Sequence, residues 1–146
     1  MQNQAYFVGI DLHKELIQVC VLDARGERVA ERRYPGPTLE QGHAVVSELE
    51  TWKEGGRFAV EALGMNRWLV NEMKSRKMEV VVVDATKLNL RMLGKKTDRR
   101  DAADLAHACR LGAYRAAHRL SREQRSVRAR IAVREALVRT RVRYVN

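Results

Sequence analysis

The stretch "YFVGIDLHKELIQVCVLDARGERVAERRY", residues 6–34, decides the fold. It begins with a short apolar run that ends in an acid at Asp11, which is typical of a buried strand. From residue 17 to residue 22 every second side chain is aliphatic, and "RGER" then provides a glycine-containing turn before "VAERRY". The stretch therefore predicts a meander of three antiparallel strands.

Helices and strands alternate after this meander. "PGP" at 35–37 interrupts the strand pattern, and Thr38 can cap a helix through about residue 53. One face of this helix would hold Leu39, His43, Val46 and Leu49. The later segments predict a strand at 57–62, an amphipathic helix at 64–76, a strand at 78–85, a short helix at 86–93 closed by Gly94, and a helix that stops at Gly112.

The four consecutive valines at 80–83 predict burial on both faces, as in a central parallel strand. Three antiparallel strands followed by two strand–helix crossovers predict an α/β fold, in which helices pack on a mixed sheet. A long C-terminal helix completes the predicted fold.

Most of the net charge of +10 lies in the C-terminal segment. Residues 114–146 hold ten arginines and two glutamates, whereas residues 1–113 are nearly balanced, so we expect a division into these two units. Arginine binds phosphate through two parallel hydrogen bonds, which favours a nucleic-acid partner over a merely solvated helix. Arg128, Arg134 and Arg141 are candidate contacts to nucleic acid.

The same segment has an apolar stripe at helical spacing. Its members are Val127, Ile131, Val138, Val142 and Val145. An unburied stripe on a long basic helix requires a partner, so we expect a homo-oligomer through this helix or further sequence that covers it.

Targeting signals and metal-binding motifs of cysteine or histidine are not evident. Cys20 and Cys109 lie far apart and match no zinc or redox spacing. His43, His107 and His118 form no ligand set, and we expect them on helix surfaces. No signal peptide and no run of about 20 apolar residues is visible. We therefore expect reduced thiols in a cytoplasmic protein of bacterial type that does not contact a membrane.

Four carboxylates lie at the ends of predicted elements. Asp11 ends the first strand and Glu61 lies near the end of the fourth, and ligand sites of α/β sheets form at strand ends. Asp98 and Asp101 are three residues apart, so they share a helix face. If that helix packs across the sheet, all four acids converge.

Converging carboxylates repel one another unless cations hold them, and Mg²⁺ or Mn²⁺ prefers such oxygen ligands. Two such ions about 3.5–4 Å apart can activate a water or hydroxyl and stabilise the leaving oxygen of a phosphodiester. His13 and Lys14 follow Asp11 directly and are either turn residues or substrate contacts. Further candidate phosphate contacts are Lys95, Lys96, Arg99 and Arg100.

Asp11, Asp98 and Asp101 also have a purely structural interpretation. Asp11 can be a turn residue at a strand end, whereas a lone Glu61 in an apolar strand favours a function. Asp98 can cap the helix. Asp104 continues the three-residue spacing and competes with Asp98 as the partner of Asp101.

Three ordered blocks resemble a known family: "GIDLHK" at 9–14, "VEALG" at 60–64 and "KTDRRDAADLA" at 96–106. They are similar to the N-terminal domain of the DEDD transposases, the insertion-sequence family that includes the Piv-type DNA invertases. The resemblance implies a domain like the RuvC Holliday-junction resolvase, with a ribonuclease H-like fold. It also implies a D-E-D-D set made of Asp11, Glu61, Asp98 and Asp101, which disfavours Asp104.

The family resemblance implies magnesium-dependent cutting and joining of DNA and, in the insertion-sequence branch, an element-encoded guide RNA. It also implies a second domain with a nucleophilic serine, joined through a coiled coil. Ser121 and Ser126 do not resemble that serine motif, and the sequence stops at Asn146 within the implied helical region. We therefore expect a catalytic domain, separate or truncated, that is incomplete without the serine-bearing domain.

Two other functions remain open. The arginine-rich helix is also compatible with a nucleic-acid-binding or oligomerisation module without catalysis. A phosphotransferase of the sugar-kinase and actin superfamily is disfavoured, because "LDARGE" at 22–27 lacks a glycine-rich phosphate loop and the chain is too short for two lobes.

Overall fold

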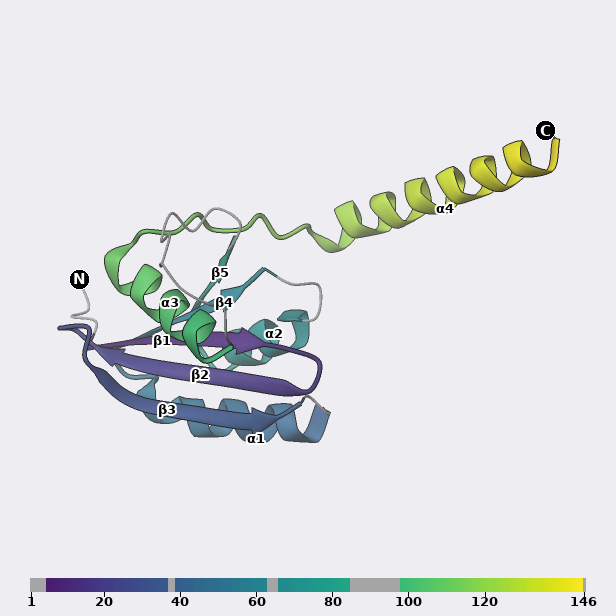
Figure 1. The fold of residues 1–146 in the computed structure, drawn as a ribbon. Coiled ribbons are helices and arrows are strands. Elements are labelled where there is room, and N and C mark those ends of the chain that lie inside the picture. Colours follow the sequence, from purple (N-terminus) through teal and green to yellow (C-terminus); the bar gives the residue numbers. More distant parts are fainter. Residues whose placement is uncertain (1–4, 37–38, 63–65, 85–97, 146) are drawn as a thin grey trace.

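The computed structural model describes residues 5–36, 39–62, 66–84 and 98–145, which form a mixed sheet with helices and a projecting helix (Figure 1). The elements in chain order are β1 (Tyr6–Leu12), β2 (Leu16–Asp23), β3 (Arg28–Pro35), α1 (Leu39–Leu49), the 3-10 helix η1 (Glu50–Trp52), β4 (Gly56–Glu61), α2 (Arg67–Ser75), β5 (Glu79–Val83), α3 (Asp98–Leu111) and α4 (Arg122–Val145).

The sheet has the strand order β3-β2-β1-β4-β5. β1 pairs antiparallel with β2, and β2 pairs antiparallel with β3, so the predicted meander is confirmed. β4 pairs parallel with both β1 and β5, as the two predicted crossovers require.

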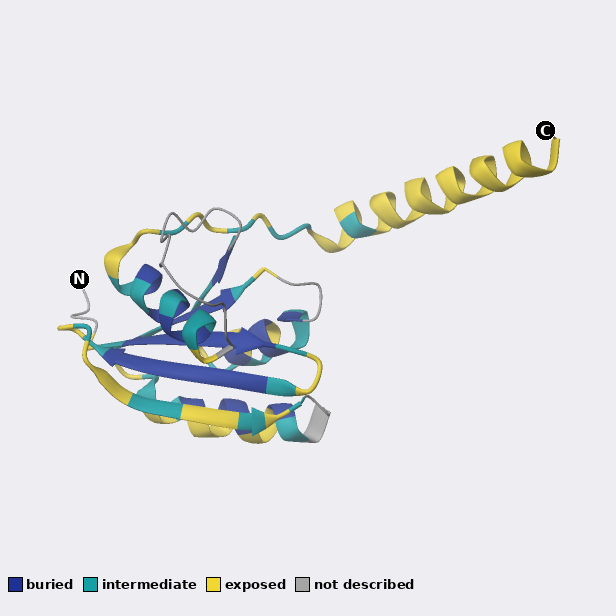
Figure 2. Ribbon diagram, viewed as in Figure 1, coloured by how far each residue is buried: buried dark blue, intermediate teal, exposed yellow. Residues whose placement is uncertain are grey.

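The two faces of the sheet carry separate clusters of buried side chains, as the alternation along each strand dictates. Val8, Ile10 and Val60 point toward α1 and α2. Phe7 and Ala59 belong to the cluster that packs against α3. α1 and α2 therefore cover one face and α3 covers the other, with the central strands buried (Figures 1 and 2).

Gly9 allows α3 to rest directly on β1. A Cβ atom at Gly9 would lie only 1.9 Å from the carbonyl oxygen of Ala102. The facing side chains of Ala102 and Ala106 are themselves small and fully buried. Farther along α3, the Cys109 thiol lies against the carbonyl of Arg57, at the beginning of β4. α3 therefore runs opposite to β1 and β4, and its first turn lies near the ends of these strands.

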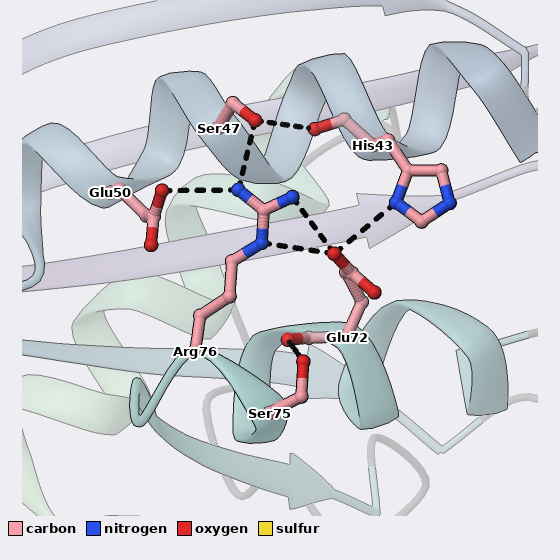
Figure 3. Close-up of polar contacts among 6 residues, drawn as sticks. All are labelled: His43, Ser47, Glu50, Glu72, Ser75 and Arg76. Atoms are coloured by element: carbon pink, nitrogen blue, oxygen red, sulfur yellow. Dashed lines mark hydrogen bonds and ion pairs between the residues drawn. The ribbon is translucent and has the colours of Figure 1, made fainter.

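α1 is joined to α2 by a network of charged and polar side chains (Figure 3). The Arg76 guanidinium donates to Glu72 at 2.8 Å, to Glu50 at 3.0 Å and to the Ser47 hydroxyl at 2.8 Å. His43 Nδ1 lies 3.2 Å from Glu72 Oε1. His43 is therefore a surface residue of α1, as expected, whereas Val46 and Leu49 of the same helix are buried.

The prediction that the valine strand is central is wrong. β5 lies at one end of the strand order and pairs with β4 alone among the described strands. Its valines are nevertheless covered on both faces: Val82 belongs to one buried cluster and Val83 to the other. The chain after α3 also covers the outer edge, because Ala117 N–H donates to the Val82 carbonyl at 2.8 Å.

α3 ends where the sequence predicts. Gly112 has φ of 63°, a conformation that glycine adopts without steric cost. Its N–H donates to the Cys109 carbonyl, and Ala113 N–H donates to the Ala108 carbonyl at 3.0 Å. This is the Schellman pattern that satisfies the last carbonyls of a helix.

α4 is the predicted long C-terminal helix, and it projects from the sheet (Figure 1). The members of its apolar stripe are exposed, as expected, with about half of Val127, Ile131 and Val138 accessible. Val133 and Leu137, outside that stripe, are exposed as well. No helix in the described ranges is long and apolar enough to span a membrane. The predictions at Thr38, at residues 86–94 and at Lys95 and Lys96 fall outside the described residues.

Candidate functional site

Asp11 is a fully buried acid at the end of β1, with 1% of its side chain accessible. Asp11 lies on the face of the sheet that α3 covers, because it alternates with the oppositely directed Ile10 and Leu12. Its Oδ2 lies 2.8 Å from His13 Nε2. Its Oδ1 is buried and has no hydrogen-bond partner among the described residues. A buried carboxylate with one unsatisfied oxygen is costly in a folded protein unless another group binds it.

Burial raises the pKa of Asp11 to about 6. The neighbouring His13 opposes this rise, because a positive charge and a hydrogen bond both favour the carboxylate. The negative charges of Glu61 and Asp101 raise the Asp11 pKa further. Three of the four predicted acids therefore interact electrostatically within one site.

Glu61 is the last residue of β4 and is half-buried. Ile10 pairs with Val60 in the parallel register, so Glu61 follows at the level of Asp11 on the adjacent strand. The Glu61 carbonyl accepts a hydrogen bond from the buried Asn66 side chain, which fixes the path from β4 into α2.

Asp101 lies in the first turn of α3 and is also half-buried. Asp98 begins the same helix, three residues earlier, so the two acids lie on one helix face. The Asp98 side chain is outside the described part of the structure. Within that part, no three His, Cys, Asp or Glu side chains are close enough together to hold a metal ion.

Asp104 shares only Asp101 with Asp11 among the charged groups that shift its pKa. Its Oδ1 is buried and unpartnered among the described residues, and burial raises its pKa. The charges that act on it are those of Arg100, Asp101 and His107. Asp104 lies about one turn after Asp101 in α3. The prediction that Asp104 does not bind metal stays a prediction.

The predicted phosphate contacts are spread over several surfaces. Lys14 is exposed beside an open pocket of about 560 Å³ that His13 also lines. Arg99 is 68% exposed, and its Nε lies 2.6 Å from Glu31 Oε1 on β3. Arg100 is half-buried, and Arg128, Arg134 and Arg141 are exposed on α4.

A polar pair that the sequence did not reveal links the acid site to β3. Gln18 lies directly opposite Asp11 in the β1–β2 register and is 5% exposed. Its side-chain amide donates to Glu31 Oε1 at 3.2 Å, and Glu31 is also the partner of Arg99. The feature of the sequence that could have revealed this pair is Gln18 itself, a polar residue at a buried position of an otherwise aliphatic strand.

The chemical type of these side chains suits a hard divalent cation. Carboxylate oxygens are the ligands that Mg²⁺ and Mn²⁺ prefer, and the unpartnered Asp11 oxygen is a group that such a cation would satisfy. A cation would also reverse the electrostatic penalty that burial, Glu61 and Asp101 impose on the charged Asp11.

Two solved structures with similar folds are RuvC and a phage terminase nuclease. RuvC from Thermus thermophilus in complex with a Holliday junction substrate is 15% identical, with a TM-score of 0.52, and the match covers 77% of this chain and 99% of RuvC. The large terminase nuclease from thermophilic phage G20c is 14% identical, with a TM-score of 0.51, over 70% of this chain and 81% of the nuclease. These similarities show a ribonuclease H-like fold.

No curated protein sequence matches this chain significantly. The family model of the IS110-type DEDD transposases, described as transposase, matches residues 8–146. This match spans the sheet, the acid site and α4. The chain therefore belongs to the IS110-type DEDD transposase family.

Proposed function

We propose that this chain is the metal-dependent DNA-cleaving domain of a transposase. The observation that carries the proposal is the buried Asp11 carboxylate, which has one unpartnered oxygen and lies within electrostatic reach of Glu61 and Asp101. Membership in a transposase family supports DNA as the substrate, as does the similarity to RuvC, which was solved with a Holliday junction.

Asp11, Glu61, Asp98 and Asp101 are the residues that would hold the ion or ions. Bound Mg²⁺ or Mn²⁺ would lower the pKa of an attacking water or hydroxyl and would stabilise the charge on the leaving oxygen. His13 orients Asp11 through its 2.8 Å hydrogen bond to Oδ2, which leaves Oδ1 for a ligand. Lys14 lines an open pocket together with His13, and its proposed role is to contact a phosphate of the strand.

Calorimetric titration with Mn²⁺ tests the site without requiring turnover. We expect Asp11→Asn and Glu61→Gln to weaken binding at least tenfold, because each removes one charged ligand. The matched control is Asp104→Asn, which removes one negative charge from α3 outside the proposed set and should bind as the wild type does. Equal affinities of the wild type and Asp11→Asn would eliminate the site.

We also propose that strand exchange requires the serine-bearing domain that the family resemblance implies. If this domain and the serine-bearing domain form one active site together, this chain alone should bind metal and DNA but should not complete recombination. A complementation assay with a separately supplied C-terminal domain would measure this. Full recombination by the present chain alone would contradict the proposal.

A nucleic-acid-binding and oligomerisation role is the second candidate, and the charge and exposure of α4 favour it. Ten arginines in residues 114–146 accompany an exposed line of aliphatic side chains. We propose that the aliphatic line pairs with another copy and that Arg128, Arg134 and Arg141 contact DNA or a guide RNA. Substituting these three arginines by glutamine should lower the salt dependence of binding while leaving Mn²⁺ affinity unchanged.

A further inference from the structure

A second pocket, of about 360 Å³, lies beside the carboxyl ends of β4 and β5. It is formed where the start of α2 meets the chain after α3 and the first turns of α4. Five basic side chains line it, and no acidic side chain of the described residues does. The basic residues are Arg67, His118, Arg119, Arg125 and Arg128.

Local hydrogen bonds hold the segments that carry these side chains. The chain before Arg119 is attached to the edge of β5, because Ala117 N–H donates to the Val82 carbonyl at 2.8 Å. α4 begins with a reciprocal cap, in which Ser121 Oγ accepts from Gln124 N–H at 3.1 Å and Gln124 Oε1 accepts from Ser121 N–H at 2.9 Å. The pocket is therefore built from ordered backbone.

Positive charges crowd together in this pocket. Burial lowers the pKa of Arg119, and the charges of Arg67 and Arg125 lower it further. Arg125 donates to the Leu120 carbonyl at 3.1 Å. Because a carbonyl carries no formal charge, this hydrogen bond leaves the positive charge of Arg125 unbalanced. Within the described ranges, Arg67, Arg119 and Arg128 form no ion pair with a carboxylate. Guanidinium groups gathered without a counter-charge are suited to bind an oxyanion, and phosphate matches their geometry.

We propose that this pocket binds a backbone phosphate of the DNA strand that reaches the acid site. Ala62 lines the pocket and directly follows Glu61, so the pocket and the acid site share the carboxyl edge of the sheet. The choice of DNA rests on the proposed function, whereas the affinity for phosphate rests on the pocket alone. Arg67 and Arg119 would bind the phosphate, and Arg125 and Arg128 would place α4 along the same strand.

The test compares the Arg67→Gln/Arg119→Gln double variant of the full chain with Arg25→Gln, a control outside the pocket. Fluorescence anisotropy with a labelled single-stranded DNA, and with RNA of the same sequence, is measured over a range of salt concentrations. We expect the double variant to bind DNA at least tenfold more weakly, because hydrogen bonds to a charged group are lost. Its slope of log affinity against log salt should fall by about 0.7 for each phosphate contact removed.

A thermal-shift measurement with inorganic phosphate probes the pocket independently of DNA. The wild type and Arg25→Gln should gain melting temperature on addition of phosphate, and the double variant should not. Without phosphate the double variant should melt no lower than the wild type, since mutual repulsion is relieved. An unchanged DNA affinity and salt slope, an equal loss in Arg25→Gln, or a loss restricted to RNA would overturn the proposal. Calorimetry with Mn²⁺ reports on the acid site separately, so the two proposals can fail independently.

Discussion

Replacing Asp11 by asparagine should stabilise the metal-free protein at neutral and alkaline pH. The pKa of Asp11 is about 6 in the folded protein, against an ordinary value of 3.8. One pKa unit corresponds to about 1.4 kcal/mol, so ionising Asp11 within the fold costs about 3 kcal/mol. Asparagine has nearly the same shape and never carries this charge.

The pH dependence has a definite sign. Because the folded pKa is raised, the folded state holds a proton that the unfolded state loses between about pH 4 and pH 6. The wild type should therefore lose stability relative to Asp11→Asn as the pH rises through this window. The two proteins should be equally stable near pH 4 and differ by up to about 3 kcal/mol at pH 8.

Urea unfolding followed by circular dichroism, at pH 4, 6 and 8 with a chelator present, measures this difference. Repeating the pH 8 titration with Mn²⁺ should narrow the difference. A ligand at 100 times its dissociation constant stabilises the wild type by about 2.7 kcal/mol, and Asp11→Asn, which binds more weakly, gains less. Asp104→Asn is the companion variant, since burial also raises the pKa of Asp104 but its response to metal should persist. An Asp11→Asn variant that is less stable than the wild type at pH 8 without metal would refute the reasoning.

Three further predictions concern packing, thiol reactivity and association. Gly9→Ala should destabilise the protein by about 3 kcal/mol or more, because the added Cβ meets the Ala102 carbonyl. Gly112→Ala has open space around it and should cost only about 1–2 kcal/mol from its left-handed conformation, so equal effects by urea unfolding would contradict this. Burial raises the pKa of Cys109 to about 11, so a thiol reagent at pH 8 should label native protein far more slowly than urea-unfolded protein. If copies associate through α4 as proposed, Val138→Glu should lower the mass found by sedimentation analysis. A wild type that sediments as a monomer, or an unchanged mass of the variant, would contradict an interface at the apolar stripe.

The strand meander, the crossovers and the strand-end positions of Asp11 and Glu61 could be predicted because local patterns encode them. The alternation of side-chain types in residues 17–22 indicates a strand with two different faces. An acid after an apolar run indicates the end of a strand. Gly9 was part of a recognised motif, but its effect depends on the distance to Ala102, which lies more than ninety residues away.

One non-local contact accounts for both the error at β5 and the pocket that the sequence did not reveal. Residues 115–117 run along the outer edge of β5 and pair with it through backbone hydrogen bonds. This pairing buries an end strand as if it were central, so the valine run indicates burial but not position. It also brings Arg119 next to Arg67, which belongs to α2. An irregular segment that pairs through its backbone shows no periodic pattern and no motif in its sequence, so this pairing could not be predicted. The positive pocket therefore became visible only once the fold had placed three distant segments side by side.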